Sequence, residues 1–286
     1  MCQTGNIAIL LATYNGERFI KEQLDSLLAQ TYQDWHLYVH DDGSQDATVA
    51  IIKEFTDKHP DKITLLDYPP TGGPCSNFLS MLKRVEARYY MFCDQDDVWL
   101  PKKIELSIEE LKKQEEQHPQ KAIAVYTDLQ IVDENLTPLF PSMWEHAGVY
   151  PQYLRTFADC GGHTAIATGC TMLFNHQAKT VVGGFPADKA LMHDIWVCLC
   201  VLKCGGILTG IEESTLLYRQ HGHNTLGATD TKAADIGICY RLRNIKKVFR
   251  SNRLYFAMLS SLGYGSVVKY LFAKIRYKQR IRRGYY

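Results

Sequence analysis

The first 130 residues alternate between short apolar runs and amphipathic segments, and this alternation restricts the possible folds more than any other feature. Residues 7–12 form a continuous apolar run, as in a strand buried on both faces, and residues 17–29 carry apolar side chains at helical spacing. The same pair of patterns then recurs, with strands expected at 35–40, 63–66, 89–93 and 122–127 and helices at 47–55, 77–87 and 101–117. Strands separated by helices predict an α/β fold with a mainly parallel sheet covered on both faces.

Beyond about residue 137 the alternation weakens. An aromatic region containing glycine and proline is followed by an expected helix at 194–202 and by a turn-rich stretch that extends to Gly227. Irregular segments of this kind often contain the loops that recognise substrates. We therefore expect the second half of the body to select the substrate.

The charge of the chain is distributed unevenly. Residues 240–286 hold 13 of the 32 Lys and Arg residues and no Asp or Glu, so residues 1–239 combine 19 basic with 31 acidic residues for a net charge of −12. No stretch is apolar enough to span a bilayer, since the best candidate, 254–272, contains Lys269, two glycines and three serines. We predict a boundary near 229–235 and a basic, amphipathic helical tail that contacts an anionic membrane. The alternatives are a solvated helical face packed on the acidic body and, less favoured, RNA binding.

The cysteines and the N-terminus favour a reducing, cytoplasmic location. Nine cysteines form an odd set, and no basic and apolar signal peptide precedes the first strand. Cys198, Cys200 and Cys204 lie in an apolar segment without a second pair of ligands. We interpret them as buried free thiols rather than as a metal cluster.

Polar residues follow three of the predicted strands at the point where each strand ends. They are 13–15 after the first strand, 41–44 after the second and 94–97 after the fourth. Ligands of open parallel sheets bind beyond these ends, and aspartates gathered there would repel a diphosphate unless Mg²⁺ or Mn²⁺ bridged them. The sequence predicts a metal-diphosphate site. For Asp41 and Asp42, ordinary turn and helix-cap chemistry is an equal alternative.

The three segments Ala12 to Asn15, Asp41 to Asp46 and Asp94 to Asp97 resemble, in order and spacing, successive signatures of family 2 glycosyltransferases with the GT-A fold. The resemblance extends over residues 5 to about 228. It implies a nucleotide-binding half at 1–128, an acceptor-binding half at 129–228 and the tail at 229–286.

The resemblance also implies roles for residues of the first half. Tyr14 would stack on the nucleotide base, Asp42 would bind the base edge, Asp94 would contact the nucleoside and Asp96 would ligate the metal. The remaining donor contacts implied there are Ala12 and Asn77.

Asn77 and a further candidate, Trp99, have structural alternatives. Asn77 follows Gly72 and Gly73 in a loop that passes near the donor in the family, but the loop also reads as an ordinary turn before a helix. Trp99 would either line the acceptor site or pack in the hydrophobic core.

Two segments of the second half resemble the rhamnosyltransferase-like subgroup. His193 and Asp194 open a helix where many family members carry Glu-Asp, and the acid at this place is the general base in the family, although it also suits a helix cap. Residues 218–224 resemble a segment that closes on the diphosphate. Arg219 and His221 would then offset charge on the donor phosphates, or His221 would complete the metal shell. His223 is more simply interpreted as a solvated loop histidine.

Taken together, these features predict inverting transfer of a sugar from a nucleoside diphosphate to a lipid-linked glycan for a surface polysaccharide. The subgroup resemblance favours dTDP-rhamnose as the donor, with a UDP-hexose as the alternative. Family analogy and the basic tail together predict a location on the inner face of the cell membrane. Three other functional classes fit the sequence less well. A haloacid-dehalogenase-like phosphatase would carry the Asp94 to Val98 motif after its first strand, and an oxidoreductase would need a Gly-x-Gly-x-x-Gly turn after the first strand, which this chain lacks. A non-catalytic sugar-nucleotide binder would not need a carboxylate at every expected position.

Overall fold

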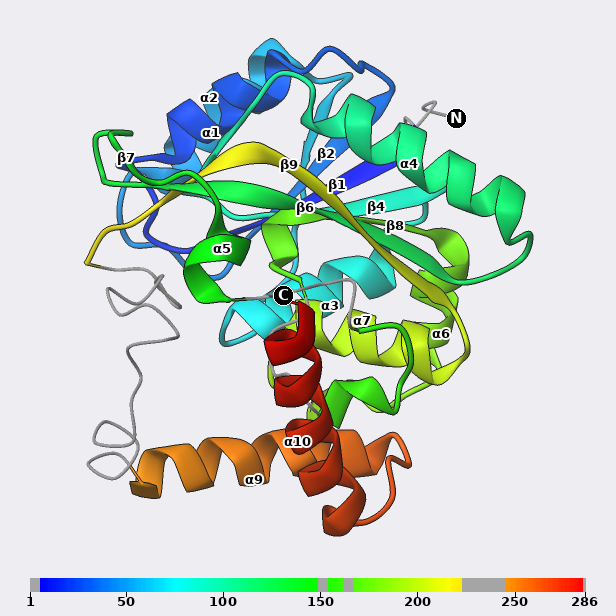
Figure 1. Cartoon of the computed structure of the whole chain (residues 1–286). Helices are drawn as coiled ribbons and strands as arrows, with labels where there is room; N and C mark the ends of the chain where they lie inside the picture. The colour runs from blue at the N-terminus through cyan, green and yellow to red at the C-terminus, as the bar shows by residue number, and fades with distance from the viewer. Residues whose placement is uncertain (1–5, 149–153, 162–166, 223–244, 285–286) are drawn as a thin grey trace.

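The computed structural model describes residues 6–148, 154–161, 167–222 and 245–284, which form one nine-stranded mixed sheet with helices on both faces (Figure 1). The strand order is β3-β2-β1-β4-β8-β6-β9-β5, and β7 pairs with β6. The strands are β1 (Ile7–Thr13), β2 (Trp35–Asp41), β3 (Ile63–Leu65), β4 (Tyr89–Cys93), β5 (Val98–Trp99), β6 (Ile123–Val132), β7 (Pro138–Phe140), β8 (Met172–Asn175) and β9 (Ile207–Arg219).

The first four strands in space, β3, β2, β1 and β4, are mutually parallel, as the sequence predicts. Along β1, Ala8 and Leu10 pack into one hydrophobic core while Ile7, Ile9 and Leu11 pack into the other. Helices α1 (Ile20–Leu28), α2 (Thr48–Lys58) and α4 (Lys103–Gln117) cover one face, and α3 (Pro74–Arg84), α6 (His176–Gly183) and α7 (His193–Lys203) cover the other (Figure 1). The doubly covered α/β sheet is therefore confirmed.

The expected helix at 77–87 starts and ends three residues earlier, as α3. Pro74 occupies its first turn, where the missing amide hydrogen costs nothing, and Val85 already has an extended backbone with φ −90° and ψ 132°. The shift matters for the site, because the N-terminus of α3 follows Gly72 and Gly73 directly.

The second half contributes strands that sequence patterns do not show. β8 runs antiparallel to both β4 and β6, and β9 runs parallel to β6, so the sheet is mixed beyond β4. The expected turn-rich stretch is wrong for Ile207–Arg219, which is a 13-residue strand. Its pairing with β6 shifts register twice near Asp128, and the exposed pair Glu212 and Glu213 interrupts the alternation that would reveal a strand. Gly227 lies outside the described residues.

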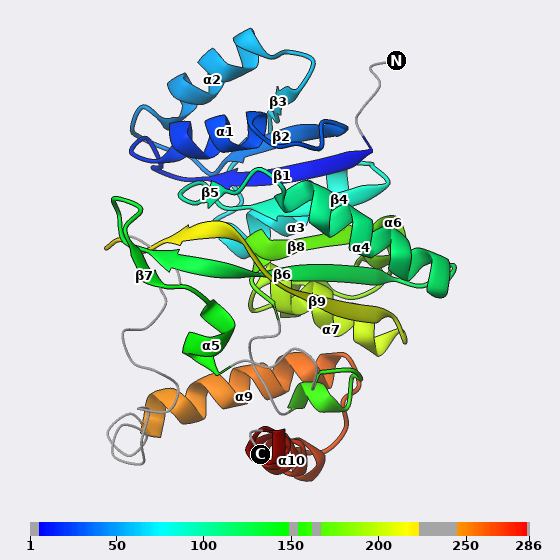
Figure 2. The same cartoon turned by 45° about the horizontal axis from the view of Figure 1, so that its top comes forward.

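The C-terminal helices α9 (Ile245–Ser261) and α10 (Val267–Gly284) lie on the side of α7 away from the sheet (Figure 2). Their inner side chains join the core of that face, including Met258 and Leu259. The Tyr255 hydroxyl donates a hydrogen bond to the Cys160 carbonyl oxygen at 2.9 Å, one of the contacts that fix these helices to the body. The expected boundary at 229–235 lies outside the described residues.

Two further expectations concern membranes and thiols. Among the described residues, no helix combines the length and the apolar character needed to cross a bilayer. Cys198 and Cys200 are buried free thiols, as expected, whereas Cys204 is exposed.

Candidate functional site

Strand register brings the three polar segments to one edge of the sheet. Thr13 pairs with Asp41 across β1 and β2, and Leu11 pairs with Cys93 across β1 and β4, so Asp94 follows at the same edge. A cavity of about 540 Å³ opens over this edge and extends to the N-termini of α3 and α7. Its lining includes every predicted site residue except Arg219 and His221, namely Ala12, Tyr14, Asp42, Asn77, Asp94, Asp96 and Asp194.

Tyr14 lies on the rim of this cavity with 57% of its surface exposed. Its backbone is fixed by Gln95, whose Oε1 accepts from the Tyr14 amide at 2.9 Å and whose Nε2 donates to the Tyr14 carbonyl at 3.0 Å. Gly16 is needed beside this bridge, because a Cβ there would lie 2.3 Å from the Gln95 Oε1. A large exposed ring on a fixed backbone suits stacking against a flat ligand group.

The loop after β2 uses Asp41 to stabilise its own turn. The Asp41 carboxylate accepts hydrogen bonds from the Gly43 and Ser44 amides at 3.1 and 2.7 Å and from the Thr13 hydroxyl at 2.9 Å. Turn chemistry therefore accounts for Asp41, which does not line the cavity.

Asp42 faces the cavity but also has backbone partners. It accepts from the amides of Thr71, Gly72 and Gly73, the last at 2.6 Å. Burial alone would raise the pKa of Asp42, but these hydrogen bonds outweigh burial and lower the pKa below its usual value. Gly72 and Gly73 have φ of 84° and 133°, which side-chain-bearing residues rarely adopt, so Asp42 holds a glycine turn against the cavity.

Asn77 anchors helix α3 to β2. Its Oδ1 lies 2.7 Å from the Nδ1 of His40, and its Nδ2 donates to the His40 carbonyl oxygen at 3.2 Å. The side chain is 1% exposed. Asn77 thus lines the cavity while its hydrogen-bonding groups fix the wall.

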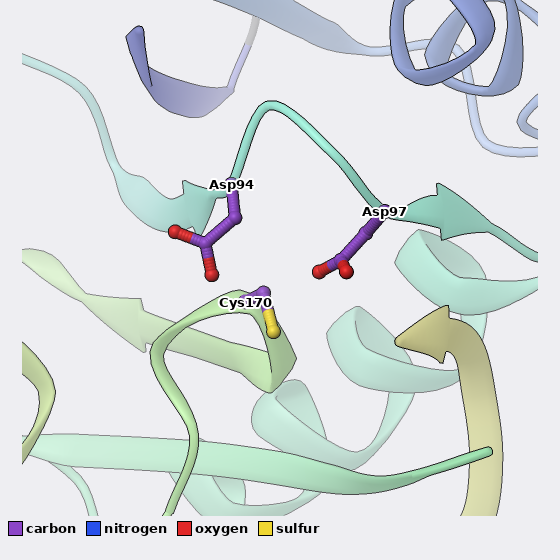
Figure 3. Close-up of side chains that lie close together, drawn as sticks. All are labelled: Asp94, Asp97 and Cys170. Atoms are coloured by element: carbon purple, nitrogen blue, oxygen red, sulfur yellow. The ribbon is translucent and has the colours of Figure 1, made fainter. Parts of the chain in front are cut away.

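The loop after β4 gathers carboxylates with few partners. Asp94, Asp97 and Cys170 point toward one another (Figure 3), and each offers an oxygen or sulfur within 4.8 Å of the others. Burial and the neighbouring charge of Asp96 raise the pKa of both Asp94 and Asp97. Burial also raises the pKa of the Cys170 thiol well above its usual range, so the thiol stays protonated and hydrogen-bonds to these carboxylates.

Asp96 and His221 form a second pair at the same edge, with 2.8 Å between Asp96 Oδ2 and His221 Nε2. Carboxylate oxygens and an imidazole nitrogen suit Mg²⁺ or Mn²⁺, whereas a protonated thiol does not. The crowding of negative charge around Asp94 is the condition that a cation relieves. Asp96 and His221 therefore offer ligand types that suit such an ion, while Asp94 belongs to the neighbouring cluster with Asp97 and Cys170.

Arg219 lies behind the aspartate loop rather than in the cavity, and its side chain is only 2% exposed. Its Nε donates to the Asp96 carbonyl at 2.9 Å, and its other nitrogens bind the Glu134 carbonyl and the Glu22 carboxylate. This geometry favours a positioning role over the direct donor contact expected from the sequence. His223 lies outside the described residues.

Asp194 occupies the first turn of α7 and lines the cavity. Its oxygens accept from the amides of Ile195 at 2.6 Å and Gly169 at 3.1 Å. Burial nevertheless raises the pKa of Asp194 to about 6. The N-cap position belongs to Met192, so a plain capping role does not describe Asp194, and an acid with this pKa in a cavity suits proton transfer.

Trp99 is 2% exposed and packs in the core with α1 and α4, so its role is structural and the acceptor-wall alternative is wrong. No sequence pattern indicates that Cys170, Thr168 and Gly169 belong to the site. They lie in the irregular half, on or beside the short 3₁₀ helix Gly169–Thr171, and only the insertion of β8 beside β4 brings them to the aspartates.

Comparisons with known proteins agree with this geometry. The model of the family described as "Glycosyl transferase family 2" matches residues 8–178. The chain is 29% identical over 233 residues to the dTDP-rhamnosyl transferase RfbG of Shigella flexneri, covering 76% of this chain and 74% of that one. It is 35% identical over 107 residues to the UDP-Glc:alpha-D-GlcNAc-diphosphoundecaprenol beta-1,3-glucosyltransferase WfgD of Escherichia coli, covering 37% and 41%.

Among solved structures, the mannosyltransferase PcManGT from Pyrobaculum calidifontis, in complex with GDP-Man and Mn²⁺, superposes with a TM-score of 0.56 at 16% identity, covering 98% of this chain and 84% of that one. At this identity the likeness shows the fold, which is the GT-A fold, with a mixed sheet between helices. Because the family model matches more than half of the sequence, the chain belongs to glycosyl transferase family 2.

Proposed function

We propose that this family member transfers a sugar from a nucleoside diphosphate to an acceptor hydroxyl with inversion at the anomeric carbon. One observation carries the proposal: Asp194, with a pKa near 6, lines the same cavity as Asp94 and Asp96. A base in the same cavity as the site for the leaving diphosphate supports a single in-line displacement.

In this mechanism Asp194 accepts the proton of the acceptor hydroxyl as its oxygen attacks the anomeric carbon. The bond from that carbon to the diphosphate oxygen breaks, and its electron pair leaves with the nucleoside diphosphate. Asp96 and His221 would hold Mg²⁺ or Mn²⁺, which would offset charge on the leaving group, and Asp94 would contact the nucleoside. Tyr14 stacks on the base, and Asp42 keeps the Gly72-Gly73 turn against the donor.

The donor we favour is dTDP-rhamnose, with a UDP-hexose as the alternative. The name of the Shigella relative and the His-Asp pair at 193–194 support rhamnose. The acceptor we propose is a lipid-linked glycan, in line with the name of the Escherichia coli relative. Such an acceptor requires the enzyme to work at a membrane surface.

Helix α10 offers a surface for that contact. Exposed apolar side chains at Val267, Val268, Leu271, Phe272 and Ile275 follow the spacing of one helical face. The opposite face, with Tyr270 and Tyr277, is buried against the body. Tyr270 and Tyr277 are therefore part of the core, and the outward apolar face of α10 is the one available to lipid.

Basic side chains flank this apolar face, with Lys269 and Arg276 on one side and Lys278 on the other. Each Lys or Arg held at an anionic bilayer contributes about 1 kcal/mol. We propose that α10 holds the enzyme peripherally on the inner, cytoplasmic face of the cell membrane.

Vesicle sedimentation tests this surface. The double substitution Leu271→Ser and Phe272→Ser is expected to shift the protein from anionic vesicles to the supernatant. Leu139→Ser, which removes a similarly exposed apolar side chain from β7, is the matched control. Equal sedimentation of both variants and the parent protein would show that α10 does not contact the membrane.

The transfer itself is tested by a panel of sugar nucleotides with Mn²⁺ and a lipid-linked acceptor. We expect transfer from dTDP-rhamnose and an anomeric configuration in the product, read by proton NMR, opposite to that of the donor. Transfer only from a UDP-hexose would show that the donor is the UDP-hexose and not dTDP-rhamnose. Retention of the anomeric configuration would contradict the inverting mechanism.

A further inference from the structure

His193, which precedes the proposed base, is a buried polar side chain that the mechanism above does not use. It is 4% exposed and lines the cavity together with Phe78 and Met192. Its ring lies 4.1 Å from the ring of Phe78 and 4.7 Å from that of Phe92, measured between centroids. The imidazole is thus held by aromatic packing and not by polar contacts.

Neither ring nitrogen of His193 has a hydrogen-bond partner among the residues that the structure describes. A buried polar group without a partner is costly, on the order of 1–3 kcal/mol. Burial lowers the pKa of His193 to about 3, so the ring is neutral at physiological pH and carries one N–H donor and one acceptor nitrogen. The wall of the cavity therefore contains, just below its surface, one donor and one acceptor that have no partner among the described residues.

The absence of a side chain at Gly169 leaves the space that the His193 ring occupies. A Cβ on Gly169 would lie 2.5 Å from Nε2 of His193, too close for any side chain. The same glycine donates its amide to Asp194. One backbone position thus sets the places of both the imidazole and the adjacent base.

We propose that His193 binds a hydroxyl of the transferred sugar and helps to select that sugar. The inference rests on the proposed transfer function. A hydroxyl is both donor and acceptor, which matches a neutral imidazole, and the transferred sugar must lie between the aspartate loop and Asp194. Phe78 and Met192 add an apolar wall that suits the C–H faces and the methyl group of a 6-deoxysugar.

The test combines variants of His193 with donors that lack single hydroxyls. With the parent enzyme, one singly deoxygenated dTDP-rhamnose is expected to lose about 10-fold or more in kcat/KM relative to dTDP-rhamnose. His193→Phe should lose a similar factor with dTDP-rhamnose but show no further loss with that analogue. His193→Gln, whose amide can both donate and accept, should restore part of the discrimination.

His36→Phe is the matched control, because this imidazole is also buried but lies on β2 outside the cavity lining. It should keep the parent's discrimination, and thermal unfolding verifies that each variant is folded. If His193→Phe loses equally with every donor, or loses nothing, His193 only packs the core and the inference is wrong. If the parent enzyme transfers from no sugar nucleotide, the proposed function fails instead.

Discussion

The two aspartate-rich loops at the sheet edge look alike in sequence but differ in their electrostatics. After β2, Asp41 and Asp42 accept hydrogen bonds from backbone amides, and the net effect on Asp42 is a lowered pKa. After β4, Asp97 is buried and Asp94 partly buried beside other carboxylates, and the pKa of both is raised.

The difference separates two kinds of strand-end aspartate in this protein. A carboxylate with several amide donors is already compensated and shapes the loop. One that is buried beside like charges is uncompensated and calls for a cation or a proton. By this criterion we infer that the β4 loop belongs to the chemical part of the site and that the β2 loop is its frame. Asp194 joins the chemical part on a different ground, because burial raises its pKa even though two amides donate to it.

The largest effect is expected at the β4 loop. Asp96→Ala should abolish measurable transfer, because it removes a proposed metal ligand and the partner of His221. EDTA should have the same effect on the parent enzyme. The measurement is kcat/KM for transfer, with the unfolding temperature as the control for folding. Transfer that persists in EDTA or in Asp96→Ala would remove the metal from the mechanism.

Asp194→Asn is expected to reduce kcat by about 100- to 10,000-fold, since an amide of the same shape cannot accept the proton of the acceptor. Donor binding, measured by calorimetry, should be retained. The exposed Asp188, five residues earlier in sequence than His193, offers Asp188→Asn as a control. If Asp194→Asn keeps activity within a few-fold of the parent, the base lies elsewhere.

The pH profile should show the raised pKa of Asp194. Because its charged form is the base, kcat/KM should fall as pH drops below about 6, by about 10-fold for each further unit. The same shift makes the folded chain hold a proton that the unfolded chain releases. Its contribution to stability is therefore lost as pH rises from the ordinary value of 3.8 to about 6. An activity profile that is flat down to pH 5 would contradict this assignment.

The smallest effect is expected at the β2 loop. Asp42→Asn should raise the donor KM by about 10-fold and lower the free energy of unfolding by about 1 kcal/mol, because the amide accepts fewer hydrogen bonds from the Gly72-Gly73 turn. Asp57→Asn, an exposed change on α2, is the control. A loss of kcat as large as that of Asp96→Ala would place Asp42 in the chemistry.

The parallel half of this fold could be predicted from the sequence, since continuous apolar runs and helical spacing are local signals. The meeting of Thr13, Asp42 and Asp94 also follows, because parallel strands end at one edge. The distinction between the two loops does not follow. It depends on the amides of Thr71 to Gly73, which reach Asp42 from a turn about 30 residues away.

The second half was less predictable for the same reason. Cys170 reaches the aspartates only because β8 inserts between β4 and β6, and Arg219 reaches Asp96 only because β9 ends beside β5. In the tail, composition predicts basic amphipathic helices, but not that Tyr255 packs on the body while Phe272 stays exposed. Long-range pairing decides each of these contacts.

The most direct measurement of the central claim is a titration with Mn²⁺ at saturating dTDP, followed by the electron paramagnetic resonance of unbound Mn²⁺. If the β4 loop is the metal-diphosphate loop and the β2 loop its frame, the parent enzyme and Asp42→Asn bind one Mn²⁺ with similar affinity, and Asp96→Ala does not bind it. Binding by Asp96→Ala at the parent's affinity, with loss of binding in Asp42→Asn, would contradict the account.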